Sequence, residues 1–146
     1  MSVSSIRSAL KFRQTVLLID DQSTVLEIHA AILKSLNINL KIVKMNDPVE
    51  ALEWMQNKQV DLIITDFRMH QMNGMEFVRT IKNAGHNSMR SIVIVTALKD
   101  EVIHQEILAA GAAACLTKPA NTQELACLAN TLLERSKHHY SLAVTE

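Results

Sequence analysis

Several features that mark membrane, secreted or nucleic-acid-binding proteins are absent from this sequence. No apolar stretch approaches the roughly 18 residues that a membrane span needs. Residues 1–7 lack the apolar core of a signal peptide. Basic and acidic residues number 15 each, so the formal net charge is zero and no basic footprint for nucleic acid is visible. We therefore expect a cytoplasmic chain with no direct contact to nucleic acid or membrane.

The sequence also has little cysteine. Only Cys115 and Cys127 are present, too few for a disulfide framework. Both lie in apolar patterns, so we expect both thiols to be buried and reduced. The six histidines show no metal-ligand spacing, and internal repeats are absent. What remains is a 146-residue chain, 48% hydrophobic, with the length and the apolar material of one domain.

Short apolar, β-branched runs alternate with helical patterns along the whole chain. Strands are expected at 16–19, 40–45, 61–65, 91–95 and 113–116, each followed by a helix. Five such units predict an α/β fold, doubly wound and flavodoxin-like, with helices on both faces of a five-stranded parallel sheet of order 2-1-3-4-5. We expect an N-terminal arm at 1–14, one domain at 15–136, and a C-terminal tail or the start of a linker helix at 137–146.

Five polar residues stand at or just after the carboxyl ends of these strands. Asp20 and Asp21 follow the first strand, and Asp66 follows the third. Thr96 follows the fourth strand and Lys118 the fifth. In the order 2-1-3-4-5 these four strands are consecutive neighbours, and the carboxyl ends of parallel strands meet at one crevice. The five side chains are therefore expected to come together.

Three carboxylates, a hydroxyl and an ammonium in one crevice indicate a divalent cation and a phosphoryl group. Clustered carboxylates repel one another unless a cation is bound, and Mg²⁺ prefers a few carboxylates with water and phosphate oxygens. Asp66 is the best candidate nucleophile, because a carboxylate can attack phosphorus to give an acyl phosphate. Lys118 and Mg²⁺ would shield the phosphoryl charge, and Thr96 would donate a hydrogen bond to a phosphoryl oxygen.

Each of these residues, taken alone, has a plainer role. Asp20 and Asp21 could simply cap the first helix. Asp66 and Thr96 are common choices at strand ends, and Lys118 could be a surface lysine. Pro119 argues against that role for Lys118, because proline fixes the loop immediately after the strand.

The segments that hold these residues resemble a known family, the response-regulator receiver domain of two-component signalling, and are similar to the chemotaxis response regulator. The matching segments are 17–21, 66–69, 72–74, 96–97 and 118–119, and the resemblance covers roughly residues 14–135. It implies that Asp66 is the phosphoacceptor and that Asp20, Asp21, Asp66 and the backbone carbonyl of Arg68 hold Mg²⁺. Thr96 and Lys118 would then engage the phosphoryl group, with a cis peptide before Pro119.

The resemblance also implies a regulatory domain rather than an enzyme. A sensor histidine kinase or a phosphotransfer protein would supply the phosphoryl group. The domain would catalyse its own phosphorylation and dephosphorylation, and a conformational change would switch output. A homodimer or an effector would use the face formed by the helix at 100–110, the strand at 113–116 and the last helix.

Four positions depart from the family pattern. Cys115 stands where receivers usually carry tyrosine or phenylalanine, so the aromatic switch is missing. His70, Asn73 and Ala120 replace a frequent proline, a frequent aspartate and a larger apolar residue. None of the four removes a member of the phosphorylation site.

Other functions compete with this one. A phosphatase of the haloacid dehalogenase type also uses an aspartyl nucleophile, but it needs a second aspartate where Arg68 stands. A degenerate receiver that only binds partners is disfavoured because all five site residues are retained. No effector motif follows residue 137. The chain is then a stand-alone receiver or a fragment of a longer regulator, whose effector could be a cyclic-nucleotide-signalling enzyme or a transcription factor.

Overall fold

The computed structural model describes residues 13–84 and 90–145, in which strands and helices alternate. The strands are β1 (Gln14–Ile19), β2 (Leu40–Met45), β3 (Leu62–Asp66), β4 (Ser91–Thr96) and β5 (Ala114–Thr117). The helices are α2 (Ser23–Lys34), α3 (Pro48–Met55), α4 (Gly74–Lys82), α5 (Glu101–Ala110) and α6 (Thr122–Thr145).

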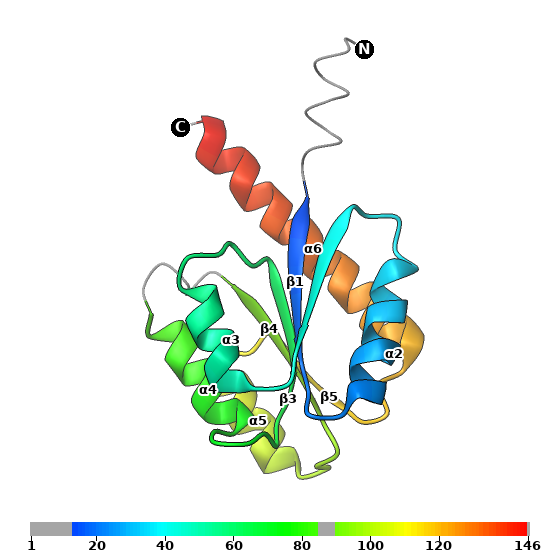
Figure 1. Cartoon of the computed structure of the whole chain (residues 1–146), viewed down its shortest axis with the longest axis vertical. Coiled ribbons are helices and arrows are strands. Elements are labelled where there is room, and N and C mark those ends of the chain that lie inside the picture. Colours follow the sequence, from blue (N-terminus) through cyan, green and yellow to red (C-terminus); the bar gives the residue numbers. More distant parts are fainter. Residues whose placement is uncertain (1–12, 85–89, 146) are drawn as a thin grey trace.

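The strands form one parallel sheet of order β2-β1-β3-β4-β5, which confirms the predicted fold class and strand order. Helices α2 and α6 cover one face, and α3, α4 and α5 cover the other (Figure 1). Alternate residues of β1 supply the two layers of the core. Val16 and Leu18 pack toward α2 and α6, whereas Leu17 and Ile19 pack toward α3, α4 and α5. Burial on both faces explains why the central strands are apolar runs without polar alternation.

Local signals in the sequence set most helix ends. Asp47 accepts a hydrogen bond from the Val49 amide at 2.9 Å, directly before Pro48 at the first helical position of α3. Directly before α6, Asn121 accepts a hydrogen bond from the Glu124 amide at 3.0 Å and so caps the helix. Gly111 ends α5 with a φ of 121°, a left-handed conformation that glycine adopts without a steric penalty.

The structure differs from the sequence-based expectations at several residues. β1 begins at Gln14, two residues before the predicted strand, and Gln14 is buried. Cys127 is exposed, so its predicted burial was wrong. Leu125 and Ala129 define the inward stripe of α6, and a residue midway between them on the helix faces away from the sheet. The glycine- and asparagine-containing segment 84–88 also predicts a loop, most of which lies outside the described residues.

Helix α6 is the longest helix of the described chain, and it extends past the edge of the sheet where β1 begins (Figure 1). Two side-chain contacts attach it there. The side-chain amide of Gln14 donates from Nε2 to the Leu133 carbonyl at 2.7 Å, and the Ser136 hydroxyl donates to Asp61 Oδ1 at 2.7 Å. Neither α6 nor any other described helix is both long and apolar enough to cross a bilayer. The domain boundaries at 15 and 136 stay a prediction.

Candidate phosphoacceptor and metal site

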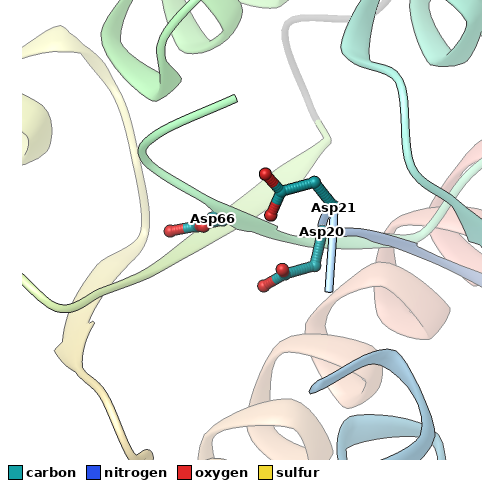
Figure 2. A group of neighbouring side chains, drawn as sticks. All are labelled: Asp20, Asp21 and Asp66. Atoms are coloured by element: carbon teal, nitrogen blue, oxygen red, sulfur yellow. The ribbon is translucent and has the colours of Figure 1, made fainter. Parts of the chain in front are cut away.

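Three carboxylates gather at the carboxyl edge of the sheet. Asp20 and Asp21 follow β1, and Asp66 is the last residue of β3 (Figure 2). Ile19 pairs with Thr65 across the two strands, which brings Asp20 level with Asp66. One oxygen from each carboxylate lies within 4.8 Å of the others. Asp20 is buried, Asp66 is half-buried and Asp21 is exposed, so the group is closed on the sheet side and open to solvent.

Lys118 joins this group from β5. Its Nζ lies 2.8 Å from Asp20 Oδ2 and 3.2 Å from Asp66 Oδ2. Its backbone is also held, because the Lys118 amide donates to the Thr96 carbonyl at 2.7 Å and the Lys118–Pro119 peptide is cis. Burial alone would lower the pKa of the Lys118 ammonium. The hydrogen bond to Asp20 and the charges of Asp66 and Asp20 outweigh burial and raise that pKa above its ordinary value.

Backbone amides fix the direction of two carboxylates. Asp20 Oδ1 accepts from the Gln22 amide at 2.9 Å, and Asp66 Oδ1 accepts from the Phe67 amide at 2.7 Å. In both residues the other oxygen, Oδ2, is the one that contacts Lys118. Asp20 and Asp66 are therefore each oriented by a backbone amide of the loop that follows them, with the second oxygen directed at Lys118.

The loop after Asp66 is packed tightly against the start of α4. The Gly74 amide donates to the Phe67 carbonyl at 2.7 Å. A Cβ on Gly74 would lie 3.1 Å from Phe67 Cα and 3.3 Å from Ile94 Cδ1, closer than nine in ten Cβ contacts. Glycine suits this position because backbone approaches backbone, and this close approach positions the chain that leaves the strand ending at Asp66.

Thr96 occupies the same edge of the sheet on β4. Asp66 pairs with Val95, so Thr96 stands one residue beyond the level of Asp66 on the neighbouring strand. Its side chain is buried, and its Oγ1 accepts from the Leu98 amide at 3.1 Å. A hydroxyl that accepts one hydrogen bond still has its own proton to donate. The structure thus brings all five predicted residues to one edge, four of them in one cluster of charges.

The acidic cluster fits a magnesium ion. Asp20, Asp21 and Asp66 offer oxygen ligands only, which is the donor type that Mg²⁺ selects over thiolate and imidazole sites. The open side at Asp21 leaves room for water ligands, and it adjoins a hollow of about 370 Å³ lined by Asn46, Asp47, His70 and Gln71. Lys118 alone does not balance three carboxylates, so a bound divalent cation would relieve their repulsion.

Comparison with known proteins agrees with this geometry. The sequence model of the response regulator receiver domain matches residues 16–130. The chain belongs to this family. The cyclic di-GMP phosphodiesterase response regulator RpfG of Xanthomonas campestris is 31% identical over 82% of this chain, and the response regulator MprA of Mycobacterium leprae is 33% identical over 84%. This receiver spans 32% of the length of RpfG and 52% of the length of MprA.

Solved receiver structures have the same fold. The chemotaxis response regulator CheY4 of Vibrio cholerae superposes with a TM-score of 0.74, at 27% identity, over 84% of this chain and 100% of that one. The chain is accordingly a regulatory domain of two-component signalling and not a classical enzyme, and phosphodonors of receiver domains are histidine kinases or phosphotransfer proteins.

One neighbour of the site was missed in the sequence. His29 on α2 is 7% exposed, and its pKa is lowered mainly by burial. The charges of Asp20 and Asp66 act in the opposite direction, whereas Lys118 adds to the lowering. The sequence did contain a signal for the burial of this side chain, because His29 lies three residues after Leu26 and four before Leu33 on the buried stripe of α2.

Proposed function

We propose that this receiver accepts a phosphoryl group on Asp66 from a sensor histidine kinase or a phosphotransfer protein, in a reaction that needs Mg²⁺ and that the domain's own residues promote. The observation that supports this most is the position of Lys118, whose ammonium contacts both Asp20 and Asp66. A cation fixed between a buried carboxylate and the candidate nucleophile is suited to neutralise an incoming phosphoryl group.

Each residue has a distinct part in this proposal. An oxygen of Asp66 attacks phosphorus, the new P–O bond replaces the P–N bond of a phosphohistidine, and the donor imidazole leaves with the electron pair. Lys118 binds one phosphoryl oxygen, and the Thr96 hydroxyl donates to another. Asp20, Asp21, Asp66 and the Arg68 carbonyl would hold Mg²⁺, which supplies positive charge for the phosphoryl oxygens when bound. Hydrolysis of the acyl phosphate, promoted by the same residues, would return the domain to its resting state.

Phosphorylation by acetyl phosphate tests the assignment of Asp66. In the presence of Mg²⁺, intact-mass spectrometry should show one added phosphoryl group, and Asp66→Asn should abolish it. Asp100→Asn is the matched control, because Asp100 caps α5 and asparagine caps a helix about equally well. An Asp66→Asn protein that gains the group at the unaltered rate would refute the assignment.

The metal is tested separately. Asp21→Ala removes an exposed carboxylate and leaves the Lys118 contacts in place. We expect this variant to bind Mg²⁺ at least tenfold more weakly and to phosphorylate correspondingly slowly at low Mg²⁺. Chelation should stop phosphorylation of the unaltered chain. Undiminished phosphorylation in excess chelator would exclude the metal role while leaving Asp66 as the acceptor.

The proposal also includes how phosphorylation of the receiver is passed on to a partner. We propose that phosphorylation alters the face formed by α5, β5 and α6, where a second copy or an effector docks. Because the relatives are longer than this chain, an effector domain on a longer regulator is a candidate, and RpfG is named as a cyclic di-GMP phosphodiesterase. A cytoplasmic location and the domain boundaries at 15 and 136 remain predictions.

A further inference from the structure

Two hydrogen bonds on one residue link the site to helix α5. The Leu98 amide donates to Thr96 Oγ1 at 3.1 Å, and the Leu98 carbonyl lies 2.7 Å from His104 Nε2. Leu98 belongs to the loop between β4 and α5, whereas His104 lies in α5 itself. The path from the Thr96 hydroxyl to the helix therefore contains one peptide backbone and one imidazole.

The second bond fixes the chemistry of the histidine. A carbonyl oxygen only accepts hydrogen bonds, so His104 Nε2 must carry a proton and donate it. At 2.7 Å this is a short bond for an N–H donor, and His104 is half-buried. The start of α5 is also held by Asp100, which accepts from the Val102 amide at 2.9 Å. The first turn of α5 is thus bound to the preceding loop by two contacts, the Asp100 cap and the His104 ring.

Apart from His104, the face formed by α5 and β5 has no ring that could couple it to the site. Neither α5 nor β5 contains phenylalanine, tyrosine or tryptophan, and the usual aromatic position on β5 is Cys115. Cys115 is half-buried and packs beside the cluster that contains Ile107 of α5. A thiol has no ring to reorient, so a shift of Thr96 cannot reach this face through β5 in the usual way.

We propose that His104 is the positioning residue that transmits phosphorylation to α5: its Nε2–H bond to the Leu98 carbonyl makes α5 follow the loop when Thr96 turns toward a phosphoryl oxygen. This inference rests on the proposed phosphorylation of Asp66. When the Thr96 hydroxyl swings to the phosphoryl group, the hydrogen bond that it accepts from the Leu98 amide either breaks or moves the amide with it. In both cases the position of the Leu98 peptide changes. His104 converts that movement into a displacement of the first turns of α5.

Helix α5 carries two exposed apolar side chains. Val102 is 65% exposed and Leu108 is 38% exposed, on either side of His104 in the sequence. A small displacement of the helix changes how these side chains are presented. The coupling therefore acts on residues that a partner would contact, and its loss should uncouple output without affecting phosphorylation.

Amide hydrogen exchange with and without beryllofluoride and Mg²⁺, a mimic of the phosphoryl group, tests the coupling. In the unaltered chain we expect altered exchange both in the loop after Asp66 and in residues 97–110. His104→Leu should keep the change near Asp66 and lose at least three quarters of the change in 101–110. His104→Gln should restore it, because a glutamine amide places an N–H donor close to the position of Nε2. Gln105→Leu, at an exposed neighbouring position, is the control.

A second measurement needs no variant. In ¹⁵N-edited spectra of the unaltered chain, the His104 Nε2–H resonance should be present before beryllofluoride and shift when it binds. An unmoved resonance, or an α5 response in His104→Leu equal to that of the unaltered chain, would overturn the role of His104 while leaving phosphorylation of Asp66 intact. Absence of any beryllofluoride effect near Asp66 in the unaltered chain would overturn the proposed function, and this inference with it.

Discussion

Lys118 contacts the two carboxylates that a metal ion would also use. Its ammonium lies 2.8 Å from Asp20 and 3.2 Å from Asp66, and its raised pKa keeps it charged at neutral pH. Lysine and Mg²⁺ therefore repel each other at the resting site, although both favour an incoming phosphoryl group. This opposition distinguishes a phosphorylation site from a site built only to bind metal.

Replacement of Lys118 should separate the two effects. We expect Lys118→Met to bind Mg²⁺ more tightly, by roughly tenfold or about 1.4 kcal/mol, because a nearby positive charge is removed. Phosphorylation by acetyl phosphate should nevertheless slow by at least tenfold, since one phosphoryl oxygen loses its cation. Magnesium titration followed by NMR and intact-mass kinetics measure the two quantities.

The control for this prediction is Lys41→Met, which removes an exposed lysine of the edge strand β2. It should change neither quantity. Weaker magnesium binding in Lys118→Met would show that the lysine organises the carboxylates rather than competing with the metal.

At the level of elements, α2 carries its histidine on the side that faces the sheet. His29 has a lowered pKa, so on acidification the unfolded chain takes up this proton before the folded chain does. The folded state gains nothing from His29 above about pH 6.5, the usual pKa of histidine. As pH falls below that value, the difference in bound protons lowers the free energy of unfolding.

We predict that this contribution is removed in His29→Leu. Below about pH 6.5 the unaltered chain should lose stability with a slope of up to about 1.4 kcal/mol per pH unit from this residue. Urea unfolding at a series of pH values should show a shallower slope for the variant. His70→Gln, at an exposed histidine, should keep the slope of the unaltered chain. Parallel slopes for the unaltered chain and His29→Leu would contradict the prediction.

The elements also show what the sequence could reveal. Two helix ends coincide with local signals, Asp47 with Pro48 at the start of α3 and Gly111 at the end of α5, because caps and left-handed residues depend on a few neighbouring atoms. Strand order placed Asp20, Asp66 and Lys118 at one edge, because parallel strands align their carboxyl ends. The hydrogen bond of His104 and the burial of Gln14 were not predictable, since each depends on a residue distant in sequence or on a rotamer set by packing.

At the scale of the whole molecule, a buried carboxylate connects two strands and the last helix. Asp61 is 5% exposed, and it accepts from the Thr15 amide at 2.7 Å and from the Ser136 hydroxyl at 2.7 Å. Both of its oxygens thus serve donors that lie far away in the sequence. This contact is at the amino edge of the sheet, opposite the edge that holds Asp66.

We predict that Asp61→Asn destabilises the fold by about 1–3 kcal/mol, because the charge-assisted hydrogen bond from the Thr15 amide becomes a neutral one and the Ser136 hydroxyl loses its carboxylate acceptor. Ser136→Ala should cost less, and the double variant should cost less than the two losses together, since both act on one contact. Urea denaturation with unchanged m-values measures this. Asp100→Asn is the matched control. Strict additivity of the two losses would show that Asp61 and Ser136 act independently.

The direction of α6 has a practical consequence. The helix runs past the amino edge of the sheet (Figure 1), and Asp66, the last residue of β3, lies at the carboxyl edge. The six residues of β1 alone separate these edges by about 20 Å at 3.3 Å per residue. A dye, an affinity tether or a sensor surface joined to the end of α6 would therefore leave the phosphodonor a clear approach. The same spacing makes a label pair on Thr145 and the Asp66 loop suitable for following the helix by energy transfer while the receiver is being phosphorylated.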